Sequence, residues 1–156
     1  MILATHKLKP IFFSFPYEAE ILPKAHVEKI SKELHVLRMD DDQVRYFEAL
    51  WKIEEGITYN AYLLMGSDDV ILFDAWKRNY ASDLLELLRS LIDPRDITHI
   101  IVHHMEPDHS GSLAEVLRQN GFRAEVLGHP LAGNMLKSFY GIEAKFKPVR
   151  DGPSSS

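Results

Sequence analysis

The stretch HHMEPDHSG, from His103 to Gly111, concentrates side chains that bind metal ions. Four of them, His104, Glu106, Asp108 and His109, form the pattern H-x-E-x-D-H. Imidazole and carboxylate donors without a thiolate are a ligand set for iron, manganese or zinc. In an extended loop, alternate residues point the same way, so the first three of these side chains can converge. Four ligands so close together are more than one ion normally takes from one loop, and we therefore expect two metal ions that share it.

Each of these residues also has a simpler interpretation. Asp108 would favour a helix N-terminus electrostatically, and His109 could be an ordinary surface residue. For the four residues together we prefer the metal site. His103 should face away from the metal if His104 faces toward it, so we expect it to contact a ligand or to pack. We interpret His99 and His129 as a strand start and a turn residue, not as ligands.

Asp74 is a further candidate, because it ends the buried strand in ILFDAWK. Its carboxylate could orient a ligand imidazole by a hydrogen bond, or it could be a simple turn residue. The residues themselves leave both interpretations open.

The pattern before residue 75 predicts short strands joined by tight turns, as in an antiparallel meander. Strands are expected over 35–39, 44–53, 57–65 and 70–73, with a turn at Asp40 to Asp42. Within 44–53, the side chains of Phe47, Ala49, Trp51 and Ile53 would share one face.

After residue 75 the period changes to that of helices alternating with strands. Leu84, Leu87, Leu88 and Leu91 form one helical stripe. A buried strand is expected over 97–102 and another over 124–128. Between them, Ser112 to Glu115 has the sequence of a capping box opening a helix that ends near Gly121. Pro130 suits the first position of a helix ending at Gly141. The metal-binding stretch therefore falls in a strand-to-helix loop.

The ends of the chain are less regular. We interpret residues 1–33 as an extension lying on the domain, with a short helix after Pro23 as the other possibility, and residues 151–156 as a polar tail. Residues 34–150 would form the domain itself.

Composition excludes several classes of protein. The 156 residues, 46% of them hydrophobic, suit a single domain with a real core. A net charge of −5 argues against nucleic acid as the main partner. The absence of cysteine excludes disulfides and thiolate metal sites. No stretch approaches the roughly 20 apolar residues of a membrane helix, so we expect a cytoplasmic protein without a membrane partner.

The metal-binding stretch resembles a known family. HHMEPDHSGSL is similar to the metal loop of flavodiiron proteins, a branch of the metallo-β-lactamase superfamily. GITYNAYLL, VILFDAWK and THIIVHHMEPDHSG are similar to the same family in the same order, and the resemblance covers roughly Leu34 to Val149. The wider superfamily commonly has H-x-H-x-D-H and binds zinc. Glu106 in place of the second histidine is the flavodiiron signature.

This resemblance implies a fold and an activity. The fold would be an α/β (α+β) protein, the metallo-β-lactamase-like αββα sandwich. The family reduces dioxygen to water, or nitric oxide to nitrous oxide, at a non-haem diiron site. Electrons come from FMN in a flavodoxin-like domain, usually that of the other subunit of a head-to-tail dimer, and often from rubredoxin. By motif, His104 and Glu106 would bind the iron nearer the flavin, and Asp108 and His109 would bind the other.

The chain departs from the family in what it lacks. A later histidine, a bridging aspartate and a final histidine have no convincing match, and the flavodoxin-like domain has none. We therefore expect the N-terminal half of a truncated protein, inactive alone, which forms a homo-oligomer or needs a partner chain carrying the missing half. A zinc-dependent hydrolase of the same superfamily and a non-catalytic remnant or split subunit are the alternatives.

Overall fold

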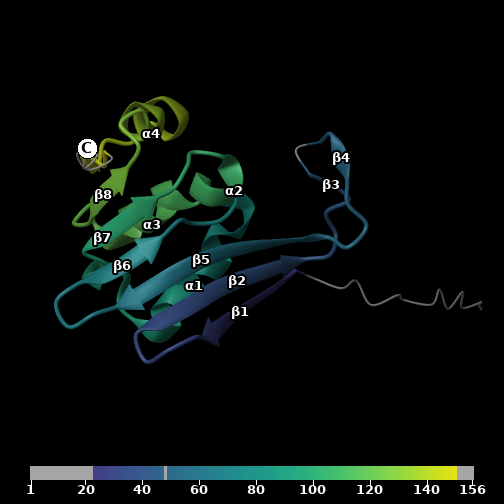
Figure 1. Ribbon diagram of the computed structural model, residues 1–156, viewed down its shortest axis with the longest axis horizontal. Helices are drawn as coiled ribbons and strands as arrows, with labels where there is room; N and C mark the ends of the chain where they lie inside the picture. Colours follow the sequence, from purple (N-terminus) through teal and green to yellow (C-terminus); the bar gives the residue numbers. More distant parts are fainter. Residues whose placement is uncertain (1–22, 48, 151–156) are drawn as a thin grey trace, which may run out of the picture.

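A seven-stranded mixed sheet organises the part of the chain that the structure, a computed structural model, describes: residues 23–47 and 49–150 (Figure 1). Its strands lie in the order β1-β2-β5-β6-β7-β8-β9, antiparallel from β1 to β6 and parallel from β6 to β9. Their bounds are β1 Lys24–Lys29, β2 Leu34–Asp41, β5 Ile57–Met65, β6 Val70–Phe73, β7 His99–Val102, β8 Glu125–Gly128 and β9 Lys145–Pro148. The antiparallel half confirms the predicted strands at 35–39, 57–65 and 70–73 and their antiparallel pairing.

Helices connect the parallel strands, as parallel pairing requires. They are α1 Ala81–Leu91, α2 Pro107–Ser110, α3 Leu113–Asn120 and α4 Ala132–Tyr140, with 3₁₀ turns at Arg78–Tyr80 and Pro94–Asp96. Both α3 and α4 end at a glycine with positive φ, Gly121 (70°) and Gly141 (64°), as the sequence predicts.

One face of the sheet carries the core. Leu37, Ala61, Leu63, Leu72 and Ile100 are fully buried there. Strand register places them on the same side, against the fully buried side chains of Leu84, Leu88, Leu113 and Leu117 on α1 and α3. Figure 1 shows these two helices on one side of the sheet. The predicted leucine stripe is thus confirmed at Leu84 and Leu88, whereas Leu87 and Leu91 are only half-buried.

The interpretation of residues 44–53 as one strand is wrong. These residues form the separate hairpin of β3 Tyr46–Phe47 and β4 Trp51–Lys52, which projects beyond the ends of β2 and β5 (Figure 1). Ala49 has a φ of 59°, which breaks the strand alternation, and the Trp51 side chain is 61% exposed. Alternating apolar residues predict a strand but cannot tell a half-buried strand from an exposed hairpin.

The expected turn at Asp40 to Asp42 begins later than predicted. Asp40 and Asp41 are the last residues of β2, and the buried Asp41 carboxylate accepts the backbone N–H groups of Gln43 and Val44. These two bonds turn the chain toward the projecting hairpin.

Residues 24–29, placed at the sequence level in an extension, pair as β1 along most of β2, so the possible helix after Pro23 is a strand. Helix α4 begins at Ala132, so Pro130 precedes it and is not its first residue. The interpretations of residues 1–22 and 151–156 lie outside the described residues. Within the described residues, no helix is long and apolar enough to cross a membrane.

Candidate metal centre

The H-x-E-x-D-H loop begins where two parallel strands end. Asp74 directly follows β6, and His103 directly follows the adjacent strand β7. The Asp74 backbone has a φ of 57° and donates its N–H to the Ile101 carbonyl at 2.8 Å. Because the carboxyl ends of parallel strands meet at one edge of a sheet, this bend brings the Asp74 side chain to the loop.

The Asp74 carboxylate organises two histidines. Its Oδ1 accepts the backbone N–H of His103 at 2.9 Å, and its Oδ2 lies 2.9 Å from Nδ1 of both His103 and His109. Asp74 is only 6% exposed. Since a carboxylate only accepts, each Nδ1 is the donor in these bonds, and the neutral His109 ring in this tautomer would present Nε2 as a lone-pair donor. The arrangement is the one that commonly orients an imidazole toward a metal ion.

The four predicted ligands form two pairs. Nε2 of His109 lies 3.8 Å from Oδ2 of Asp108, and Nδ1 of His104 lies 3.3 Å from Oε2 of Glu106. The pairs adjoin, because the rings of His104 and His109 have centroids 4.0 Å apart at 50°. His104 and Glu106 are the more exposed pair.

The Asp108 carboxylate gives the most direct structural support for a bound cation. Its Oδ1 is buried and has no hydrogen-bond partner within the described part of the chain. Asp108 lines a cavity of about 160 Å³ together with Asp74, His109 and residues of β5. A buried carboxylate oxygen without a donor is costly unless a cation or water satisfies it, so the donor set here fits a metal ion.

These side chains are nevertheless not arranged as a finished site. Across residues 23–47 and 49–150, no three histidine, aspartate or glutamate side chains are placed to hold one ion. The structure brings Asp74, His103 and His109 together. It also pairs His104 with Glu106 and Asp108 with His109. It does not converge all four ligands on one point.

Two residues before α3, Gly111 and Ser112, fix the shape of the loop. A Cβ at Gly111 would lie 2.5 Å from the Pro107 carbonyl oxygen and 2.7 Å from the Arg78 nitrogen, so only glycine fits. Ser112, predicted to cap a helix, instead accepts the Trp76 N–H and donates to the Trp76 carbonyl. Ser112 is the N-cap residue of α3, as predicted, but its side chain makes no cap bond because the hydroxyl binds a segment 36 residues away, which no local motif reveals.

Helix α4 adds an apolar wall beside the exposed ligand pair. His104 and Glu106 line a pocket of about 540 Å³ with His129, Leu131, Met135 and Phe139, among others. His129 accepts the Leu131 N–H at 3.3 Å, as a turn residue does. His99 lies at the start of β7, at the far end of that strand from the loop, and its Nδ1 is 2.9 Å from the Thr98 hydroxyl.

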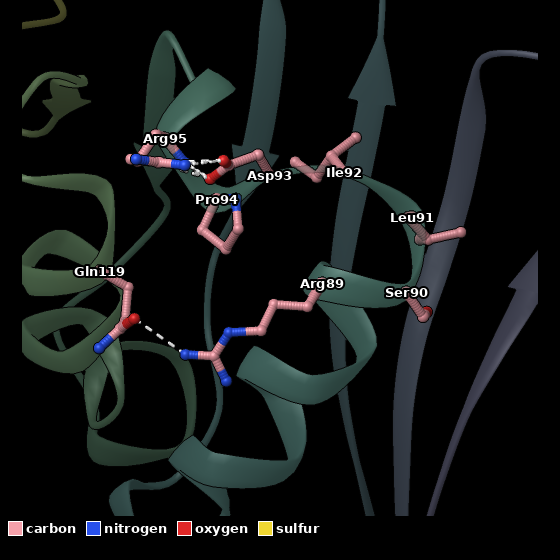
Figure 2. Close-up of a pocket in the computed structure, with 8 residues that line it drawn as sticks. All are labelled: Arg89, Ser90, Leu91, Ile92, Asp93, Pro94, Arg95 and Gln119. Atoms are coloured by element: carbon pink, nitrogen blue, oxygen red, sulfur yellow. Dashed lines mark hydrogen bonds and ion pairs between the residues drawn. The ribbon is translucent and has the colours of Figure 1, made fainter.

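A further cavity, of about 710 Å³, lies elsewhere (Figure 2). It is bordered by the end of α1, the Pro94–Asp96 turn and Gln119. Figure 2 shows its two guanidinium groups already engaged, Arg95 by Asp93 and Arg89 by the Gln119 carbonyl. Hydrogen bonds from Arg95 lower the pKa of Asp93 to about 2. These lining residues offer no imidazole, and the one hydroxyl among them, that of Ser90, already donates to the Leu87 carbonyl, so the loop remains the candidate site.

Comparisons with known proteins show the family and the fold of the chain. Residues 57–155 match the family model described as ODP family beta lactamase. Flavo-diiron protein FprA2 of Clostridium acetobutylicum is 38% identical over 88 residues, which cover 56% of this chain and 22% of that protein. A crystal structure of a flavoprotein from Thermotoga maritima is 47% identical with a TM-score of 0.79, covering 83% of this chain and 33% of that one.

A more distant structure, rubredoxin oxygen:oxidoreductase from Desulfovibrio gigas, is 27% identical with a TM-score of 0.74, over 81% of this chain and 31% of that one. The α/β fold expected from the sequence is thereby confirmed. The chain spans only 22% of the length of the first curated relatives that it matches.

Proposed function

Because this chain belongs to the ODP beta-lactamase family and its relatives are flavodiiron proteins, we propose that His104, Glu106, Asp108 and His109 supply ligands to a non-haem diiron centre. The observation that carries the proposal is the unpartnered, buried Oδ1 of Asp108 beside a histidine that Asp74 orients. The proposed reaction of the whole protein is reduction of dioxygen to water, of nitric oxide to nitrous oxide, or of both.

Donor chemistry favours iron over zinc in this loop. A carboxylate at Glu106, where the wider superfamily commonly has histidine, makes the ligand set harder and more anionic, and such sets stabilise a metal in a higher oxidation state. Bound iron would supply the redox chemistry. The electrons would come from FMN in a flavodoxin-like domain or partner subunit, and from a rubredoxin-type donor.

The residues of this chain would prepare the site for the metal. Asp74 holds the proton of His109 on Nδ1, so that Nε2 is available for coordination. Asp74 also forms a hydrogen bond with His103. This supports the interpretation that His103 contacts Asp74, which orients the proposed ligand His109, and does not itself bind the metal. Leu131, Met135 and Phe139 form an apolar wall of the pocket that His104 lines.

The described residues offer half of a ligand set. We therefore propose that the remaining ligands come from a second chain or from sequence outside the matched region, and that this chain alone binds iron weakly and does not turn over. Residues 34–150 would be part of a metallo-β-lactamase-like domain. Strand β1 adds one strand at the edge of its sheet. We propose that the protein is cytoplasmic.

Metal uptake tests the proposal. The chain is expressed in medium that contains both iron and zinc. After purification it is analysed for metal content and titrated anaerobically with Fe(II). We expect weak iron binding that His109→Ala abolishes and that Asp74→Asn weakens about tenfold, because the ring loses its orienting acceptor.

His99→Ala is the matched control, since that histidine lies at the other end of β7, and it should bind iron like the unsubstituted chain. Exclusive zinc uptake, or iron binding that survives His109→Ala, would overturn the proposal.

A further inference from the structure

A buried serine at the end of α2 ties the metal-binding loop to α4. Ser110 is fully buried, and its Oγ lies 3.0 Å from the Met105 carbonyl, 3.0 Å from the Glu106 carbonyl and 2.7 Å from the Tyr140 hydroxyl. The Ser110 backbone N–H also binds the Glu106 carbonyl, at 2.9 Å. One side chain thus joins both ends of the segment that carries Glu106, Asp108 and His109.

The directions of these bonds follow from the groups involved. A carbonyl can only accept, so the single proton of Ser110 is committed to the Met105 and Glu106 carbonyls. The Ser110 oxygen must then accept from Tyr140, whose hydroxyl is the donor. Chains of hydrogen bonds with one direction strengthen one another in a water-poor interior.

Tyr140 is itself held by the helix that it ends. It is the last residue of α4, and Gly141 follows it in the left-handed conformation. That helix packs closely on β9, since a Cβ at Gly133 would lie 2.8 Å from the Phe146 ring. The Tyr140 hydroxyl therefore reaches Ser110 from a fixed position.

We propose that Tyr140 is a positioning residue for the metal centre, acting through Ser110. Its hydroxyl donates to Ser110, which holds the Met105 and Glu106 carbonyls and so keeps Asp108 and His109 in place for a metal ion. The inference rests on the proposed function, because it concerns ligands of the proposed centre.

The test uses the full chain with Tyr140→Phe, Ser110→Ala and the double variant, and Tyr46→Phe on the β3–β4 hairpin as the control for loss of an exposed phenol. Two readouts are made: Co(II) affinity with its visible spectrum, and the NMR signals of the His109 ring nitrogens in the metal-free chain. We expect Tyr140→Phe to weaken Co(II) binding about fivefold to tenfold, alter the Co(II) spectrum and shift the His109 signals, since one buried hydrogen bond is lost.

Non-additivity identifies the route. In the Ser110→Ala background, Tyr140→Phe should have no further effect on either readout. If the unsubstituted chain binds Co(II) and Tyr140→Phe binds it equally well with the same spectrum, the inference fails while the proposed function stands. If the unsubstituted chain binds no Co(II), the proposed function fails. In that case the NMR signals of the His109 ring nitrogens test whether Tyr140 positions this ring. The inference is overturned if these signals are the same in Tyr140→Phe and in Tyr46→Phe.

Discussion

At the scale of single residues, one oxygen of the Asp74 carboxylate contacts Nδ1 of both His103 and His109. The residue type and its position after a buried strand leave open whether Asp74 is such an acceptor or a simple turn residue. Only the structure supplies the φ of 57° that lets one oxygen reach Nδ1 of both His103 and His109. A backbone conformation that is rare outside glycine is not encoded in any local pattern of residue types.

Tyr80 makes a second such link, between the 3₁₀ turn that precedes α1 and the base of the projecting hairpin. Its hydroxyl donates to the Asp41 carboxylate, which also accepts two backbone N–H groups. Burial, and then the hydrogen bond to Asp41, raise the pKa of Tyr80 well above its usual 10.0. The folded chain therefore holds this proton more firmly than the unfolded chain does.

Stability at alkaline pH should reveal this difference. The contribution of Tyr80 is complete below about pH 10, the value of the unfolded tyrosine, and is lost as the pH rises above it toward the raised folded value. We expect Tyr80→Phe to cost about 1 kcal/mol at neutral pH and less at about pH 11. Urea unfolding at both pH values measures the change, with Tyr46→Phe as the control. A constant difference between Tyr80→Phe and the unsubstituted chain would contradict the expectation.

At the scale of elements, the hydrogen bonds that join one element to another were less predictable than the elements themselves. We call a side chain that makes such bonds a joint. The strands predicted at 57–65 and 70–73, and a helix carrying the leucine stripe from Leu84 to Leu91, are all present. The bonds that lock them, such as Ser112 to Trp76, join residues far apart in the chain. Local motifs compete with such distant partners, so a serine that reads as a helix cap can serve another segment.

Asn120 is the clearest of these joints. It is fully buried at the end of α3 and uses all its polar capacity: its amide donates to the Pro94 and Ile97 carbonyls, and its oxygen accepts the N–H groups of Arg123 and Ala124. It therefore joins the connection before β7 to the connection before β8.

Removal of this side chain should cost more than any nearby surface change. Asn120→Ala removes four hydrogen bonds, three of them buried, so we expect a loss of about 3 kcal/mol in the free energy of unfolding. The neighbouring Gln119→Ala, which removes only an exposed bond to Arg89, should cost about 0.5 kcal/mol. Urea denaturation of both variants makes the comparison, and equal losses would show that Asn120 is not a joint.

At the scale of the whole molecule, the two faces of the sheet are unequal. The sequence predicted α/β layers, and the family resemblance predicted half of a sandwich; neither the hairpin nor β1 was part of that expectation. Strand register shows that Tyr62, Phe73, Ile101 and Leu127 stand in one row across β5, β6, β7 and β8. This row lies on the face opposite the buried core, and among the described residues no helix covers it.

An apolar row of this length on an open face should make the chain self-associate. We expect sedimentation to give a mass that rises with concentration above 17.9 kDa, because each copy lowers its exposed apolar area by covering that of another. Ile101→Lys places a charge in the middle of the row and should return the mass toward that of one chain. Leu50→Lys on the hairpin alters a more exposed apolar residue, 75% accessible, and should leave association unchanged. A single-chain mass at every concentration, or equal effects of the two substitutions, would show that the open face does not drive association.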